Sequence, residues 1–110
     1  MKVYISGKIG EEVISDATRE KFARAEKILG ALGYDVFNPV TSGLGKMADN
    51  HAIATGHSFY REILALDIEA LNNCDAIFML PDYEESPGAL AELAFARAVG
   101  MVEMYQVKPQ

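Results

Sequence analysis

The chain has 110 residues and a formal net charge of −6; 50% of its residues are hydrophobic and 24% are charged. This length and balance predict one globular domain over residues 1–110, with enough apolar residues for a core without disulfides. The acidic balance argues against a nucleic-acid polymer as partner, and no apolar run is long enough to span a membrane.

The cysteine and histidine content argues against a disulfide and against a metal centre. Cys74 is the only cysteine, which fits a reducing compartment, and we interpret it as a core residue. His51 and His57 form no zinc-ligand pattern with it and are interpreted as surface residues, so no metal and no cofactor are expected. The N-terminal sequence lacks the pattern of a signal peptide, and we therefore expect a cytoplasmic protein.

The first third of the chain has a strand–helix–strand pattern. Lys2–Ile5 is β-branched and aromatic, as in a strand, and the loop Ser6–Gly10 follows it. Asp16–Leu32 has apolar residues at three- and four-residue steps, which predicts an amphipathic surface helix. After the stop signal Gly33, Tyr34–Phe37 is predicted to be the second strand.

The middle of the chain begins with a segment that has no clear period. Residues 38–57 are therefore expected to be irregular, and so long a loop is usually either functional, often a lid, or mobile. Ser58 can cap the N-terminus of a helix that extends to about Asn73.

The last third contains two predicted strands with a helix between them. Asp75–Leu80 is an almost continuous apolar run, typical of a strand that is buried on both faces. The loop Pro81–Glu85 leads to a helix over residues 87–99, with Ser86 as its N-cap and proline at its first position. Met101–Val107 is the last strand.

This alternation of strands and helices predicts an α/β fold. We expect a single three-layer domain, with a flavodoxin- or Rossmann-like parallel sheet of four to five strands and helices on both faces. Ligands of such sheets bind beyond the carboxyl ends of the strands. Here those ends are the segments Ser6–Gly10, 38–57 and Pro81–Pro87.

Asp67 lies in the middle of the apolar face of the helix 58–73. At about 100° per residue it falls among apolar neighbours three and four residues away, including Ile63 and Leu71. An unpaired carboxylate in such surroundings is unfavourable or takes up a proton. Asp67 is therefore either a core residue bonded to a backbone amide or a buried arginine, or a group with a chemical role.

Glu92 is one of two charged residues in the otherwise apolar helix 87–99. It lies in the second turn, beyond the first turn where a carboxylate commonly interacts with the helix dipole. It is either a partly exposed residue of a mostly buried helix or a candidate nucleophile or acid–base group. Two such carboxylates, on helices that flank one buried strand, can enter a single cleft, and paired carboxylates are typical of enzymes that cleave glycosidic bonds.

Three segments of the chain resemble the nucleoside 2-deoxyribosyltransferase superfamily, which also contains the 2′-deoxynucleoside 5′-monophosphate N-glycosidases. The similar segments are Lys2–Ile9, Asp67–Asp75 and Leu80–Ala94. The most specific features are the spacing from Asp67 to Asp75 and the pattern of Ser86, Gly88 and Glu92. The resemblance covers nearly the whole chain, least well at residues 40–57, and implies a nucleoside 2-deoxyribosyltransferase-like domain over residues 1–110.

The resemblance also implies roles for individual residues. Glu92 matches the nucleophile that attacks C1′ of the deoxyribose, Asp67 the acid that assists departure of the base, and Tyr4 the tyrosine that positions the nucleophile. The residues that match the walls around the sugar and the base, or around a 5′-phosphate, are Ser6, Gly7, Lys8, Ile9, Ser86 and Gly88. The implied activity is N-glycosidic cleavage or deoxyribosyl transfer on a 2′-deoxynucleoside or its 5′-monophosphate, in a homo-oligomer.

Two questions stay open at this point: whether the substrate carries a 5′-phosphate, and whether the protein is an enzyme. Ser86 favours a nucleotide, since the transferases tend to have aspartate at this position, but it can also be only a helix cap. Asp82, Glu84 and Glu85 in the same loop would repel a phosphate, with Lys8 as the nearby compensating cation. The alternatives to an enzyme are a nucleoside- or nucleotide-binding module without turnover, and a protein in which both carboxylates are structural.

Overall fold

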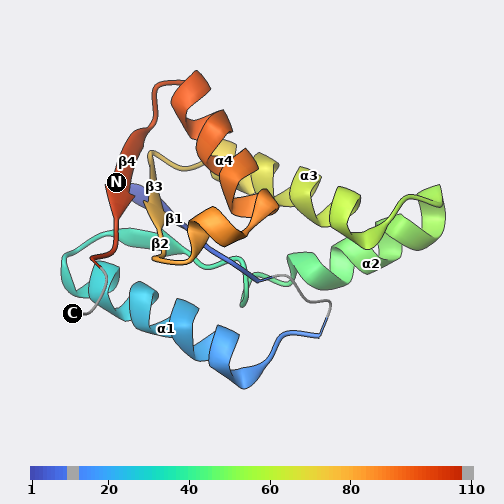
Figure 1. The fold of residues 1–110 in the computed structure, drawn as a ribbon, viewed down its shortest axis with the longest axis horizontal. Coiled ribbons are helices and arrows are strands. Elements are labelled where there is room, and N and C mark those ends of the chain that lie inside the picture. Colours follow the sequence, from blue (N-terminus) through green and yellow to red (C-terminus); the bar gives the residue numbers. More distant parts are fainter. Residues whose placement is uncertain (10–12, 108–110) are drawn as a thin grey trace.

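Four parallel strands form the sheet in the described part of the chain, which comprises residues 1–9 and 13–107 of a computed structural model (Figure 1). The strands are β1 (Lys2–Ser6), β2 (Asp35–Phe37), β3 (Ala76–Met79) and β4 (Val102–Tyr105). Their spatial order is β2-β1-β3-β4. The helices are α1 (Asp16–Ala31), α2 (Leu44–Thr55), α3 (Phe59–Asn72) and α4 (Pro87–Ala98), with a short 3-10 turn, η1 (Tyr83–Glu85).

Helices cover both faces of the sheet, and β1 contributes to both cores. Figure 1 shows α1 on one side of the strands and α3 and α4 on the other. Successive side chains of a strand point to opposite faces, and accordingly Val3 and Ile5 pack in the core on the α1 side, whereas Tyr4 packs with residues of α3 and α4. The predicted three-layer α/β fold is confirmed.

The predicted helix starts are confirmed by their caps. The Ser58 side chain accepts a hydrogen bond from the Arg61 amide, and that of Ser86 accepts one from the Ala89 amide. These bonds satisfy amides that have no partner within their own helix. None of the helices within the described ranges is long and apolar enough to cross a membrane.

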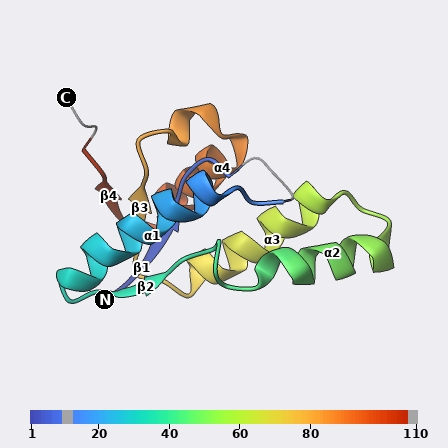
Figure 2. The ribbon, with the colours of Figure 1, turned by 90° about the horizontal axis from the view of Figure 1, so that it is seen from below.

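The prediction of an irregular segment over residues 38–57 is wrong, because α2 occupies most of it. Leu44, Ala48 and Ala52 lie four residues apart and are the half-buried to buried residues of one face. This face packs against α3, and the two helices lie side by side and extend beyond the sheet (Figures 1 and 2). Gly43 and Gly56 are the N-cap and C-cap of this helix, with φ angles of 82° and 76°. The helix therefore has no N-cap side chain that would indicate its start in the sequence.

The carboxyl ends of β1 and β3 are held close together. The Leu80 amide donates to the Ser6 carbonyl at 2.8 Å. A Cβ atom on Gly7 would lie 2.7 Å from Leu80 Cδ1, so only glycine allows this approach. The predicted loop Ser6–Gly10 is described as far as Ile9, and Gly10 lies outside the described residues.

Candidate active site

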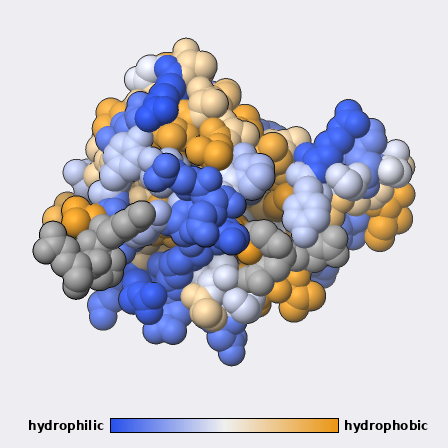
Figure 3. Space-filling view, in the orientation of Figure 1, coloured by the Kyte–Doolittle hydropathy of each residue, from blue (hydrophilic) through white to orange (hydrophobic). Residues whose placement is uncertain are grey.

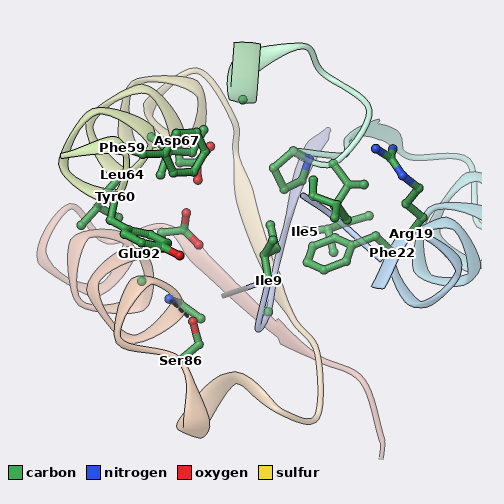
Figure 4. Close-up of a pocket in the computed structure, with 18 of the residues that line it drawn as sticks. Ile5, Ile9, Arg19, Phe22, Phe59, Tyr60, Leu64, Asp67, Ser86 and Glu92 are labelled. Carbon is green, nitrogen blue, oxygen red and sulfur yellow. Dashed lines mark hydrogen bonds between the residues drawn. The ribbon is translucent and has the colours of Figure 1, made fainter. Parts of the chain in front are cut away.

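A cavity of about 850 Å³ lies at the carboxyl ends of the strands, and all four α-helices contribute to its walls. Figure 4 shows Asp67, Glu92 and Ser86 on one side of this space and Ile5, Phe22 and Arg19 on the other. Most of the lining is apolar. A cavity of this size with a few polar groups is typical of a site for a small ligand.

Glu92 lies in the second turn of α4 with its carboxyl group directed to β1. Its side chain is buried, yet it lines the cavity. The Tyr4 hydroxyl donates to Oε2 at 2.7 Å, and the Ser6 hydroxyl donates to Oε1 at 2.6 Å. Tyr4 and Ser6 are two residues apart on β1, so their side chains are on the same face of the sheet.

Burial raises the pKa of Glu92 to about 7, although the hydrogen bonds from Ser6 and Tyr4 favour its ionised form. The pKa of Tyr4 is well above its usual value because the phenol is buried and lies beside the Glu92 carboxylate. Tyr4 is therefore a hydrogen-bond donor over the whole neutral range. Glu92 is the group that changes its charge near pH 7.

Asp67 lines the same cavity from α3 and has a different environment. Its side chain is buried, and its Oδ1 has no hydrogen-bond partner among the described residues. Burial, together with the charge of Glu92, raises the pKa of Asp67 to about 8. At neutral pH Asp67 is therefore a neutral carboxylic acid that can donate a proton into the cavity.

The residues expected around the substrate divide into three groups. Gly7, Ile9, Ser86 and Gly88 line the cavity. Ser6 does not belong to the described lining and bonds Glu92 instead. Lys8 is also outside the described lining: its side chain is exposed, and its amide donates to Asp82 Oδ1 at 3.0 Å.

The acidic residues of the loop after β3 do not face the cavity. Asp82 forms an ion pair with Lys21 at 2.6 Å. Burial opposes ionisation of Asp82, but the hydrogen bonds from Lys21 and from the Lys8 amide outweigh it and lower the pKa. Glu84 and Glu85 are exposed, and neither belongs to the described lining. The expected repulsion of a phosphate by this loop is therefore largely removed.

The cations near the site come from residues that sequence reasoning did not select. Arg19 of α1 and Lys46 of α2 line the cavity, and neither forms an ion pair within the described part of the chain. Arg19 has the pattern of a solvated helix face, and Lys46 belongs to the helix that was not predicted. Phe59, Tyr60 and Leu64 of α3 also belong to the cavity wall.

The remaining candidate residues, His51, His57 and Cys74, do not belong to the described cavity lining. His57 Nδ1 is 2.6 Å from Glu62 Oε1, and His51 is exposed. Cys74 is buried in the core between the sheet and the helices α3 and α4. Among the described residues there is no group of three or more metal-ligating side chains.

The chain matches a family model over nearly its whole length, and its fold is similar to that of a solved structure. The family model described as "Domain of unknown function (DUF4406)" matches residues 1–105. The structure is similar to that of a 2-deoxyribosyltransferase from the psychrotolerant bacterium Bacillus psychrosaccharolyticus, with a TM-score of 0.66 and 19% sequence identity. The match covers 99% of this chain and 77% of that chain. No curated protein has a matching sequence.

Proposed function

The chain belongs to the family described as "Domain of unknown function (DUF4406)", and we propose that it is an enzyme that cleaves N-glycosidic bonds. The substrate is a 2′-deoxynucleoside or its 5′-monophosphate. One observation carries this proposal: Glu92 and Asp67 line one cavity, Glu92 with two hydroxyl donors and Asp67 with an unpartnered buried oxygen. The fold, which is that of a 2-deoxyribosyltransferase, supports the same class of reaction.

In the proposed mechanism Glu92 is the nucleophile and Asp67 is the proton donor. The ionised Glu92 attacks C1′ of the sugar, the bond from C1′ to the base nitrogen breaks, and Asp67 gives its proton to the departing base. The product is an ester between C1′ and Glu92. Water or a second base then attacks C1′ and gives a proton to Asp67, and the bond from C1′ to Glu92 breaks. This gives hydrolysis or transfer with retention of configuration and restores both carboxyl groups.

The charges around the cavity are compatible with a 5′-monophosphate as well as a nucleoside. Asp82 is neutralised by Lys21 at 2.6 Å, and Glu84 and Glu85 are outside the described lining. Arg19 and Lys46 are the cations on the cavity wall that a phosphate would meet. We therefore keep both substrates in the proposal.

The test is base release by the purified protein. It is incubated with a panel of deoxynucleosides, ribonucleosides and their 5′-monophosphates, with and without a second free base, and the products are separated by chromatography. Glu92→Gln is expected to abolish base release. Glu69→Gln, an exposed residue of α3, is the matched control and is expected to retain it. Base release that persists in Glu92→Gln would overturn the assignment of the nucleophile.

The same experiment separates an enzyme from a binding module. Calorimetric binding of a nucleoside or nucleotide, with no base release across the whole panel, would support the module without turnover. No binding and no base release would favour two structural carboxylates.

The expected homo-oligomer is also part of the proposal. Tyr60 of α3 and Leu90 of α4 have exposed fractions of 54% and 43%. Apolar side chains gather over α4 on the face shown in Figure 3. Sedimentation or size-exclusion chromatography with light scattering tests this expectation, and a monomer at all accessible concentrations would contradict it.

A further inference from the structure

Each oxygen of the Glu92 carboxyl group has its own hydroxyl donor on β1. Tyr4 Oη donates to Oε2 at 2.7 Å and Ser6 Oγ to Oε1 at 2.6 Å. Two donors on different oxygens fix the plane of the carboxyl group as well as its position. Removal of either donor would leave one oxygen of a buried carboxylate without this partner, which costs more than the loss of an exposed hydrogen bond.

Ser6 is part of the sheet and not of the cavity wall. Its side chain is 1% exposed and does not belong to the described lining, whereas Tyr4 and Glu92 do. The Ser6 carbonyl accepts from the Leu80 amide at 2.8 Å, which anchors the residue at the end of β1. The hydroxyl can therefore affect a ligand in the cavity only through Glu92.

We infer that Ser6 is a positioning residue that keeps Glu92 ionised and oriented, which for catalysis rests on the proposed role of Glu92 as nucleophile. A short O–H···O⁻ hydrogen bond favours the charged acceptor. Burial favours the protonated form, which is a poor nucleophile. The hydrogen bond from Ser6 therefore opposes the effect of burial, which favours the protonated form of Glu92.

Other groups near Glu92 also influence its ionisation, but none of those described donates a hydrogen bond to Oε1 in place of Ser6. Tyr4 from β1 already donates to the other oxygen, and burial keeps it protonated. Asp67 from α3 is the neighbouring carboxyl group, and its proton is retained through the neutral range. Among the described residues, the remaining titratable or charged side chains of this core and of the cavity lining are Cys74, Tyr83, Tyr60, Arg19, Lys46 and Asp49.

The test is a titration of the Glu92 carboxyl group by NMR in the full-length protein, labelled with ¹³C at the glutamate Cδ. Glu92→Gln assigns the resonance. Ser6→Ala is expected to move the midpoint upward by about one to two pH units, since a hydrogen bond to the charged form is lost. If Ser6→Ala does not fold, Ser6→Cys, which keeps the size and weakens the donor, is expected to shift the midpoint in the same direction.

A second buried serine provides the matched control. The Ser86 hydroxyl accepts from the Ala89 amide at 3.1 Å, and no hydrogen bond joins it to Glu92 among those described. Ser86→Ala is therefore expected to leave the midpoint of Glu92 in place. An unshifted midpoint in the folded Ser6 variant, or an equal shift in Ser86→Ala, would overturn the inference.

The activity assay gives a second readout and separates the two proposals. The ascending limb of the pH–rate profile is expected to move upward in the Ser6 variant by the same amount as the NMR midpoint. The NMR titration needs no substrate, so absence of base release by the unaltered protein contradicts the proposed function alone. Base release that requires Glu92, with an unshifted midpoint in the Ser6 variant, contradicts the role of Ser6 alone.

Discussion

Glu92 and Asp67 line one cavity from neighbouring helices, but their carboxyl groups have opposite hydrogen-bond environments. Glu92 accepts from two hydroxyls, whereas Asp67 Oδ1 accepts from none of the described residues. Their pKa values are about 7 and about 8, and burial is the main cause of both shifts. Between these values the pair contains one carboxylate and one carboxylic acid, as a nucleophile and a proton donor require.

The rate of base release is expected to have a bell-shaped pH dependence with its maximum between these two pKa values. The rate rises as Glu92 ionises near pH 7 and falls as Asp67 loses its proton near pH 8. The measurement is kcat/KM between pH values of about 5 and 10. Asp67→Asn is expected to lower the maximum and to remove the descending limb. A descending limb that survives in this variant would contradict the assignment of the proton donor.

Tyr4→Phe is expected to lower kcat by about 10- to 100-fold while the fold is retained, because it removes one hydrogen bond to a charged group. The ring of Tyr4 is stacked on that of Phe37, with centroids 5.5 Å apart and an interplanar angle of 8°, so phenylalanine can keep the same place. Tyr105→Phe is the matched control, since the Tyr105 hydroxyl donates to Glu103 on the edge strand β4 and Tyr105 is not part of the described cavity lining. Equal kcat values for the two variants would contradict a role for the Tyr4 hydroxyl.

The free energy of unfolding is expected to fall as the pH rises from about 4 to about 8. In this window the folded protein retains protons on Asp67 and Glu92 that the unfolded chain releases, and above pH 8 the loss is complete. Asp67→Asn replaces the acid with a neutral side chain of the same shape. Urea denaturation is expected to show a gain on the order of a few kcal/mol at pH 9 and little change at pH 5. Equal effects at both pH values would contradict the raised pKa of Asp67.

Gly7→Ala is expected to destabilise the protein by about 1–3 kcal/mol. The added Cβ would lie 2.7 Å from Leu80 Cδ1 and 2.8 Å from Leu80 Cβ, so the ends of β1 and β3 would have to separate. Gly30→Ala is the matched control: Gly30 lies in the last turn of α1, its Cβ would meet nothing within 4 Å, and alanine is expected to stabilise the helix by at most about 0.5–1 kcal/mol. Denaturant unfolding of both variants checks these opposite signs.

Replacement of Arg19 and Lys46 by alanine is expected to raise KM for a deoxynucleoside 5′-monophosphate more than KM for the nucleoside. Both side chains line the cavity and pair with no described acid, so each can meet a phosphate by charge-assisted hydrogen bonds. Steady-state kinetics on the matched pair of substrates measure the difference. An equal change for both substrates would place the phosphate elsewhere.

Much of the fold could be predicted from the sequence because most elements carry a strong local signal. The β3 run is apolar throughout, and Ser58 and Ser86 mark the starts of α3 and α4. The missed helix, α2, begins after a glycine without a side-chain cap, and Ala48 is its one fully buried residue. Its stability depends on packing against α3, which a local pattern does not contain.

Part of the candidate site could likewise be predicted from local sequence patterns, and part depends on the tertiary structure. Asp67 and Glu92 could be found because each interrupts an apolar helix face. The bond from Ser6 to Glu92 could not, because it joins residues 86 apart and depends on how α4 packs on β1. Arg19 has the sequence pattern of a solvated helix face, and only the tertiary structure brings it to the cavity.

Tyr4 and Glu92, which are joined by a hydrogen bond, lie 88 residues apart in the sequence, and this separation matters during synthesis of the chain on the ribosome. At ordinary rates of translation, roughly 4 to 18 seconds separate the synthesis of these two residues. During that interval the hydroxyls of Tyr4 and Ser6 cannot form their hydrogen bonds to the Glu92 carboxyl group. An incomplete nascent chain therefore lacks the proposed nucleophile, and the hydrogen-bonded Glu92 carboxyl group forms only after the ribosome has made nearly the whole domain.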